Sequence, residues 1–164
     1  MFTATVKTDD SGAQQIIEAI ECLQKTQVLV GIPEAKDARK EGEMTNAGLL
    51  YIHSNGSPKN NIPARPVIEP AIEHNKENLG ELMGEAAKAA MNGDSTGANK
   101  QLEMAGMAGQ NAAKDWFTNR SNGWAPVKEE TQKRKAKRGA TDNRPLIDTG
   151  ELRNAITYTV EERQ

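Results

Sequence analysis

The feature that most constrains this chain is a pair of long helical patterns separated by one short break. Apolar and small residues recur at three- and four-residue spacing through residues 67–91 and again from about residue 95 to 119. Asn92-Gly93-Asp94 interrupts the repeat, because glycine and short polar side chains favour turns. A short connection makes consecutive helices antiparallel neighbours. The sequence therefore predicts a helical hairpin rich in alanine and glycine. Its two apolar faces hold Ile68, Ile72, Leu79, Leu82, Met83, Ala86, Ala87 and Ala90, and then Leu102, Met104, Ala105, Ala108, Ala112, Ala113, Trp116 and Phe117.

Three shorter patterns predict strands. Residues 2–7 alternate between apolar and polar side chains, the period of a half-buried strand. Residues 27–32 form a compact apolar run that predicts a central strand, and Pro33 ends it because proline cannot donate a ladder hydrogen bond. Residues 156–160 alternate again. Together these elements predict an α+β fold, a small, mostly antiparallel β-sheet packed against the long helical hairpin.

Capping residues predict further helices. Asp9, Asp10 and Ser11 can accept the unpaired N–H groups of a first turn, and the helix that follows ends near Lys25. Thr45 and Thr149 can start two shorter helices in the same way, the second over residues 151–155. The apolar residues expected on one face of the first helix are Ile16, Ile17, Ile20 and Leu23.

The whole chain, residues 1–164, is predicted to be one domain with flexible loops at about 34–44, 54–66 and 120–146. Hydrophobic residues make up only 36% of the chain and aromatic residues only 4%, a thin core for this length. Partner subunits can supply the missing burial, so an oligomer and extended inter-subunit loops are expected. The net charge of −2 gives no global field toward nucleic acid or an anionic membrane.

The single cysteine excludes an internal disulfide framework and fits a reducing cytoplasm. Cys22 lies within an apolar helical pattern, so we expect a buried, inert thiol. No apolar run approaches the ~20 residues of a membrane span, and the N-terminus lacks a secretory signal pattern. Neither a membrane partner nor export is therefore expected.

Four segments resemble a single protein family, and their order and spacing match it over about four-fifths of the chain. They are residues 30–33 (Val-Gly-Ile-Pro), 46–56 (from Asn-Ala to Asn-Gly), 62–66 (Ile-Pro-Ala-Arg-Pro), and Trp-Ala-Pro at 124–126 with Thr131, Arg134-Lys135 and residues 144–156. The family is the neck or tail-completion proteins of tailed bacteriophages, also called virion morphogenesis proteins, which includes distant relatives of the lambda tail-completion protein Z. Two positions depart from it: Val67 stands where the family usually has phenylalanine, and Ser54 where it often has an acidic residue.

The resemblance implies a structural subunit rather than an enzyme, with no cofactor and no metal. Such proteins form a ring, commonly a hexamer, between the head connector or adaptor and the tail terminator or tail tube. DNA passes through the central channel. The location implied is the neck or tail of the virion, after assembly in the host cytoplasm. The residues expected at inter-subunit contacts are Ile62, Pro63, Arg65, Pro66, Val67, Trp124, Pro126, Arg144 and Leu146.

Arg65 stands between two prolines, which would hold it on a stiff stem suited to a carboxylate partner. The alternative is that residues 62–66 only lead into the long helix. Trp116 is expected in the core and Trp124 at an interface, because tryptophan is enriched in both settings. His53 is expected to pack at a helix end and His74 to be exposed, with no metal-ligand spacing around either.

Two motifs offer other functions. The basic run at 133–138 can contact DNA phosphates, and a DNA-contacting accessory protein is the second hypothesis. The residues concerned are Lys133, Arg134, Lys135, Lys137 and Arg138. The alternative, which we favour, is that the basic run is a solvent-exposed face of a helix or loop. No aromatic side chain lies between its cations to stack on bases. Asp148-Thr149-Gly150 matches the aspartic protease signature, but a single copy followed by a helix start favours a turn with a helix cap.

Overall fold

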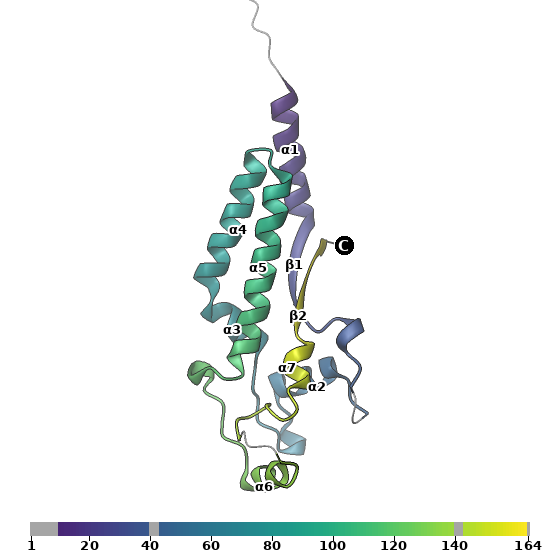
Figure 1. Cartoon of the computed structure of the whole chain (residues 1–164), viewed down its shortest axis with the longest axis vertical. Coiled ribbons are helices and arrows are strands. Elements are labelled where there is room, and N and C mark those ends of the chain that lie inside the picture. The colour runs from purple at the N-terminus through teal and green to yellow at the C-terminus, as the bar shows by residue number, and fades with distance from the viewer. Residues whose placement is uncertain (1–9, 40–42, 140–142, 164) are drawn as a thin grey trace, which may run out of the picture.

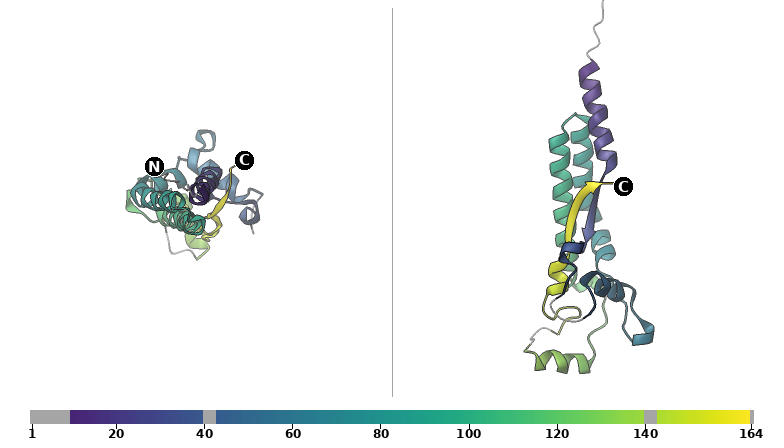
Figure 2. Two further views of the ribbon diagram at one scale, coloured as in Figure 1. Left: turned by 90° about the horizontal axis from the view of Figure 1, so that it is seen from above. Right: turned by 90° about the vertical axis from the view of Figure 1, so that its right-hand side faces the viewer.

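The computed structural model describes residues 10–39, 43–139 and 143–163. Figure 1 shows an elongated molecule, with three long helices side by side at one end and short helices and turns at the other. A two-stranded sheet runs between the two ends (Figures 1 and 2). The α+β prediction is confirmed.

The predicted helical hairpin is formed by α4 (Lys76–Met91) and α5 (Ser95–Trp116). Gly93 takes a positive φ of 74° at the break, a conformation that favours glycine. Asp94 then caps α5 by accepting a hydrogen bond from the Gly97 backbone N–H at 2.8 Å.

The prediction of one continuous helix over residues 67–91 is wrong. The segment divides into α3 (Ile68–His74) and α4, and Asn75 lies between them outside helical geometry, at φ −109° and ψ 14°. The Asn75 side chain donates to the Ala71 carbonyl at 2.8 Å, so it competes locally with the helical hydrogen-bond ladder. Periodicity alone does not reveal such a break.

The helix α1 (Asp10–Lys25) is present as predicted, and its predicted apolar face is buried only in part, at Ile20 and Leu23. Ala19 packs with Ala90 and Ala98, whereas Ile16 and Ile17 are 36% and 50% exposed. Cys22 is also exposed, so the prediction of a buried thiol is wrong. Leu23 packs against the same cluster, whereas Ile16 and Ile17 lie outside it.

The sheet pairs β1 (Thr26–Gly31) antiparallel with β2 (Thr157–Glu162), and Val28 lies opposite Val160. The strand predicted at residues 27–32 is confirmed as β1, which in the described sheet pairs with β2 alone. The strand predicted at residues 2–7 lies outside the described residues.

Both strands pack on α5, and two glycines of that helix let them approach closely. A Cβ placed on Gly106 would lie 2.8 Å from Cγ of Tyr158, and closer still to Cδ2. A Cβ on Gly109 would lie 2.9 Å from a methyl carbon of Val30. The glycines therefore set the distance between the helix and the sheet.

The core lies where α5 ends and the two ends of the molecule meet. Its largest fully buried side chains are Phe117, Ile156 and Val67. Trp116 is buried as predicted, and the exposed ring of His74 lies 5.3 Å from it between centroids. Within the described residues, no helix is both long and apolar enough to cross a membrane.

The remaining elements are short and lie at the lower end of Figure 1. Thr45 caps α2 (Asn46–Asn55) by accepting from Gly48, as predicted. The Thr149 hydroxyl accepts the Glu151 N–H at the start of α7 (Glu151–Ala155), also as predicted, although Gly150 is the N-cap residue. The expected loops contain helical turns. They are η1 (Glu34–Lys36), η2 (Pro58–Asn60), η3 (Arg120–Asn122) and the helix α6 (Glu129–Lys137).

We expect Gly106→Ala to destabilise the chain by about 1–3 kcal/mol, because the added methyl group must displace the Tyr158 ring. Alanine would otherwise favour the helix by about 1 kcal/mol. Gly84→Ala is the matched control, since a Cβ there meets nothing within 4 Å. Urea denaturation measures both. Equal stabilisation by the two substitutions would show that the sheet does not rest closely on α5.

Candidate functional site

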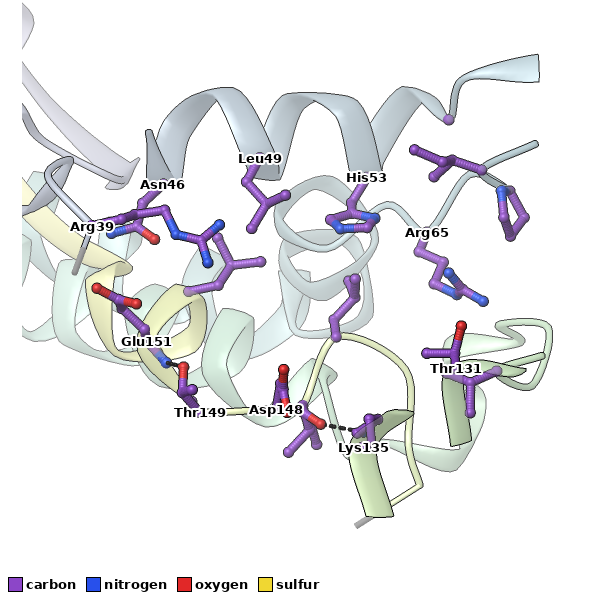
Figure 3. A pocket seen from close by; sticks show the side chains of 18 of the residues that line it. Arg39, Asn46, Leu49, His53, Arg65, Thr131, Lys135, Asp148, Thr149 and Glu151 are labelled. Carbon is purple, nitrogen blue, oxygen red and sulfur yellow. Dashed lines mark hydrogen bonds between the residues drawn. The ribbon is translucent and has the colours of Figure 1, made fainter. Parts of the chain in front are cut away.

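A groove of 1570 Å³ opens at the end of the molecule that holds the short elements. Its walls are α2, the turn that follows α2, the loop at residues 125–128 with α6, and the segment that leads into α7 (Figure 3). These segments lie far apart in the sequence. Concave surfaces of this kind are where proteins commonly bind ligands or partners.

The turn after α2 is built from local hydrogen bonds. Ser57 and Ile62 exchange backbone hydrogen bonds of 2.8 and 3.0 Å, which closes the turn around η2. The Arg65 N–H then donates to the His53 carbonyl at 2.6 Å. Residues 54–66 therefore form one wall of the groove, and their flexibility stays a prediction.

Arg65 and Val67 belong to the interior of the chain. Arg65 is only 8% exposed and donates from Nη2 to the Ala125 carbonyl at 3.1 Å. Val67 is fully buried in the main core cluster. The prediction of an inter-subunit contact is wrong for Val67, and the exposed, stiffly held guanidinium predicted at Arg65 is not observed.

Trp124 is half-buried rather than presented to solvent. Its ring meets Phe117 edge-on at 5.9 Å between centroids, and its Nε1–H donates to the Pro66 carbonyl at 3.2 Å. These contacts use Trp124 to join the loop before α6 to the core, so its main contacts are within the chain. Leu146 is also half-buried and packs against the same cluster. The exposed residues of the predicted contact set are Pro63, Pro66, Pro126 and Arg144, and Ile62 is half-buried.

One cation of the basic run at 133–138 is buried, and the other four are exposed. Lys135 is 5% exposed, and its Nζ donates to the carbonyls of Arg144 and Ile147, the first at 3.0 Å. The DNA contact predicted for Lys135 is therefore wrong, because its ammonium is enclosed by carbonyl groups of its own chain. Lys133, Arg134, Lys137 and Arg138 remain exposed, and Lys133 pairs with Glu129 at 2.9 Å.

Cations outnumber anions around the groove. Its described lining contains two carboxylates, Asp148 and Glu151, against seven basic side chains: Lys36, Arg39, Arg65, Lys128, Arg134, Lys135 and Arg138. Arg138 approaches Asp148 at 3.8 Å, but Arg39, Arg65 and Arg134 have no carboxylate within ion-pair distance among the described residues. The groove therefore presents an uncompensated positive charge.

Four buried polar atoms of the groove lining have no hydrogen-bond partner among the described residues. They are Nε of Arg39, Oδ1 of Asn46, Nδ1 of His53 and Nε of Arg65. In Figure 3 these four side chains lie in a row along α2 and its flanking loops. Buried polar groups are usually paired, so a cluster of unpaired ones in one groove indicates a site that a further group completes.

The pKa of His53 is lowered, first by burial and then by the positive charges of Arg65 and Arg39. His53 therefore stays neutral near pH 7. Burial also lowers the pKa of Arg65, although a guanidinium remains charged. The cationic character of the groove thus comes from its arginine and lysine side chains.

Two of these groove residues, Arg39 and Asn46, were not predicted as site residues. Asn46 is 1% exposed and donates from Nδ2 to the carbonyls of Lys36 and Ala38, which holds the loop that carries Arg39. The resemblance includes Asn46, so a signal for this position was present in the sequence. Arg39 lies in a charged segment that gives no such signal.

Asp148-Thr149-Gly150 forms the turn before α7, as predicted. No group of three or more His, Cys, Asp or Glu side chains in the described parts of the chain could hold a metal ion. No family model, curated protein or solved structure matches this chain.

We expect Lys135→Met to destabilise the α6 end by about 2 kcal/mol, because two buried carbonyls lose a charged donor. Lys137→Met, an exposed position on the same helix, should change stability by less than about 0.5 kcal/mol. Hydrogen exchange at residues 144–147 with urea denaturation would measure this. Equal effects of the two substitutions would contradict the structural role of Lys135.

We expect the pKa of His53 to lie below 6.5 and to rise in Arg39→Gln, which removes one repelling charge. The unfolded chain binds the proton more readily, so His53 contributes stability above pH 6.5. That contribution is lost as the pH falls from 6.5 toward the folded-state pKa. NMR titration of the imidazole would measure the value, and an unshifted titration would contradict the packing described.

Proposed function

We propose that this chain is a structural subunit of the head–tail junction of a tailed bacteriophage, a neck or tail-completion ring protein. The observation that carries the proposal is that three of the four segments on which the resemblance rests line one groove. Those segments fall at residues 46–56, 62–66 and 124–156. A resemblance that reflected only helix packing would instead have followed α4 and α5.

The surface of the chain supports an assembly role. Several large apolar side chains of the described residues are exposed: Tyr51, Met83, Met91, Met104 and Met107. Neighbouring subunits would bury surface of this kind.

The proposed partners are further copies of the chain in a closed ring, together with head connector and tail proteins. A ring closes when one surface of a subunit meets a different surface of the next. The groove and the long helices are two such surfaces, at opposite ends of an elongated molecule (Figure 2). In this proposal the chain carries out no catalysis and acts in the virion.

The alternative is a DNA-contacting accessory protein, and the exposed cations of α6 favour it. The burial of Lys135 removes one contact from that hypothesis. The acidic start of α6, at Glu129 and Glu130, lowers its net charge further. The free chain should then bind duplex DNA weakly, whereas a slope of log K against log salt of about −3 or steeper would favour the alternative.

The proposed function predicts a specific assembly defect. In phage extracts that lack this chain, we expect filled heads and finished tails to accumulate without joining, and the purified chain to restore joined particles. Electron microscopy with the labelled chain would locate it at the neck. Normal particles in its complete absence would refute the proposal.

A further inference from the structure

A row of carboxylates occupies the outer surface of α3 and α4. Glu69, Glu73, Glu77, Glu81 and Glu85 recur at every fourth residue, and all five are exposed. We call these five residues the acidic row. Residues four apart lie on neighbouring turns of one helix face, although Asn75 interrupts the row between Glu73 and Glu77.

Part of the acidic row is compensated within the chain. Lys76 pairs with Glu73 at 2.6 Å and Lys88 pairs with Glu85 at 2.5 Å. Glu69, Glu77 and Glu81 have no ion pair or hydrogen bond to any described residue. Uncompensated carboxylates therefore remain toward the middle and the α3 end of the row.

The groove carries positive side chains that have no carboxylate partner among the described residues. Arg65 is more than nine-tenths buried, yet its Nε has no acceptor, and Arg39 has the same deficit. A guanidinium with an unused N–H is best satisfied by a carboxylate, which accepts charge-assisted hydrogen bonds. Arg134 adds a third unpaired cation at the α6 wall.

One copy of the chain does not use its own acidic row to fill its own groove. The helix α4 packs against α5 and α1, away from the groove walls. Figure 1 shows α4 in the half of the molecule opposite α6. Two complementary surfaces that cannot meet within one copy can meet between copies, and such a contact repeats from subunit to subunit.

We propose that the groove of one copy binds the acidic row of a second copy, whose carboxylates meet the exposed cations Lys36, Lys128 and Arg134 of the groove walls. This inference rests on the proposed ring function and names the contact that closes the ring. The partner is a second copy rather than DNA because apolar and backbone groups also line the groove. Leu49, Ile62, Pro63 and Leu146 lie there, and they suit a protein surface better than a phosphate backbone.

Isotope-coded cross-linking tests the contact directly. A zero-length carbodiimide joins carboxylates to lysine amines in a mixture of ¹⁴N- and ¹⁵N-labelled full-length chains. We expect mixed-isotope links from Glu69, Glu77 or Glu81 to the groove lysines Lys36 or Lys128. Links found only within one isotope, or between other surfaces, would overturn the proposal.

Charge reversal gives a second, independent test. Arg134→Glu should weaken self-association about tenfold or more, since it places a negative charge opposite the acidic row. Lys137→Glu is the matched control, because it makes the same change on the same helix outside the groove lining. Glu77→Lys with Glu81→Lys should weaken association similarly, and combining it with Arg134→Glu should restore part of the loss. Sedimentation equilibrium measures each, and equal behaviour of Arg134→Glu and Lys137→Glu would overturn the proposal.

The outcomes also separate this contact from the proposed function. If reversed variants still join heads to tails at the normal rate, the interface is wrong and the ring function is unaffected. If the cross-links form but the chain never enters particles, the interface is right and the phage function is wrong. Loss of the mixed-isotope links on adding a short DNA duplex would assign the groove to nucleic acid and overturn the protein contact.

Discussion

The close approach of α5 to the two-stranded sheet is the contact on which the rest of the structure depends. Two strands cannot form a stable sheet by themselves, so β1 and β2 need a backing surface. Gly106 and Gly109 supply it by removing the side chains that would hold the strands away from the helix. Because β1 leads toward α2 and β2 follows α7, this contact also fixes where the walls of the groove begin.

The groove is held open by polar contacts rather than by a second hydrophobic core. Lys135 of α6 donates a hydrogen bond to the segment before α7. Arg65, in the turn after α2, donates to the Ala125 carbonyl, and Trp124 donates to the Pro66 carbonyl. Each of these contacts uses one side chain to bind a backbone carbonyl of a distant segment. The arrangement leaves several arginine and histidine atoms without partners, a deficit that a neighbouring subunit would remove in the proposed ring.

The thin core and the extended surface follow from the same composition. Alanine and glycine let α1, α4 and α5 lie close together, but each buries little area, so the helices remain a slender bundle. The larger side chains of α1, such as Ile16 and Ile17, are left on the outside. Large apolar side chains such as Tyr51 and Met91 are also exposed, and the acidic row adds exposed carboxylates. Assembly into a ring is a physical way for such a chain to complete its burial.

The sequence by itself determined the local structure. Helical periodicity, the cap at Thr45 and the turn at Gly93 depend on neighbouring residues only, so they could be predicted. The roles of Arg65, Val67 and Lys135 could not, because burial depends on segments up to 60 residues away that local patterns do not encode. Polar side chains that look suited to a partner instead bind segments of their own chain, as Arg65 and Lys135 do, while Arg39 lines the groove although its charged segment gives no signal of that. Only the tertiary structure decided which charges are neutralised within the chain and which remain for another molecule, because that balance is set by distances across the groove.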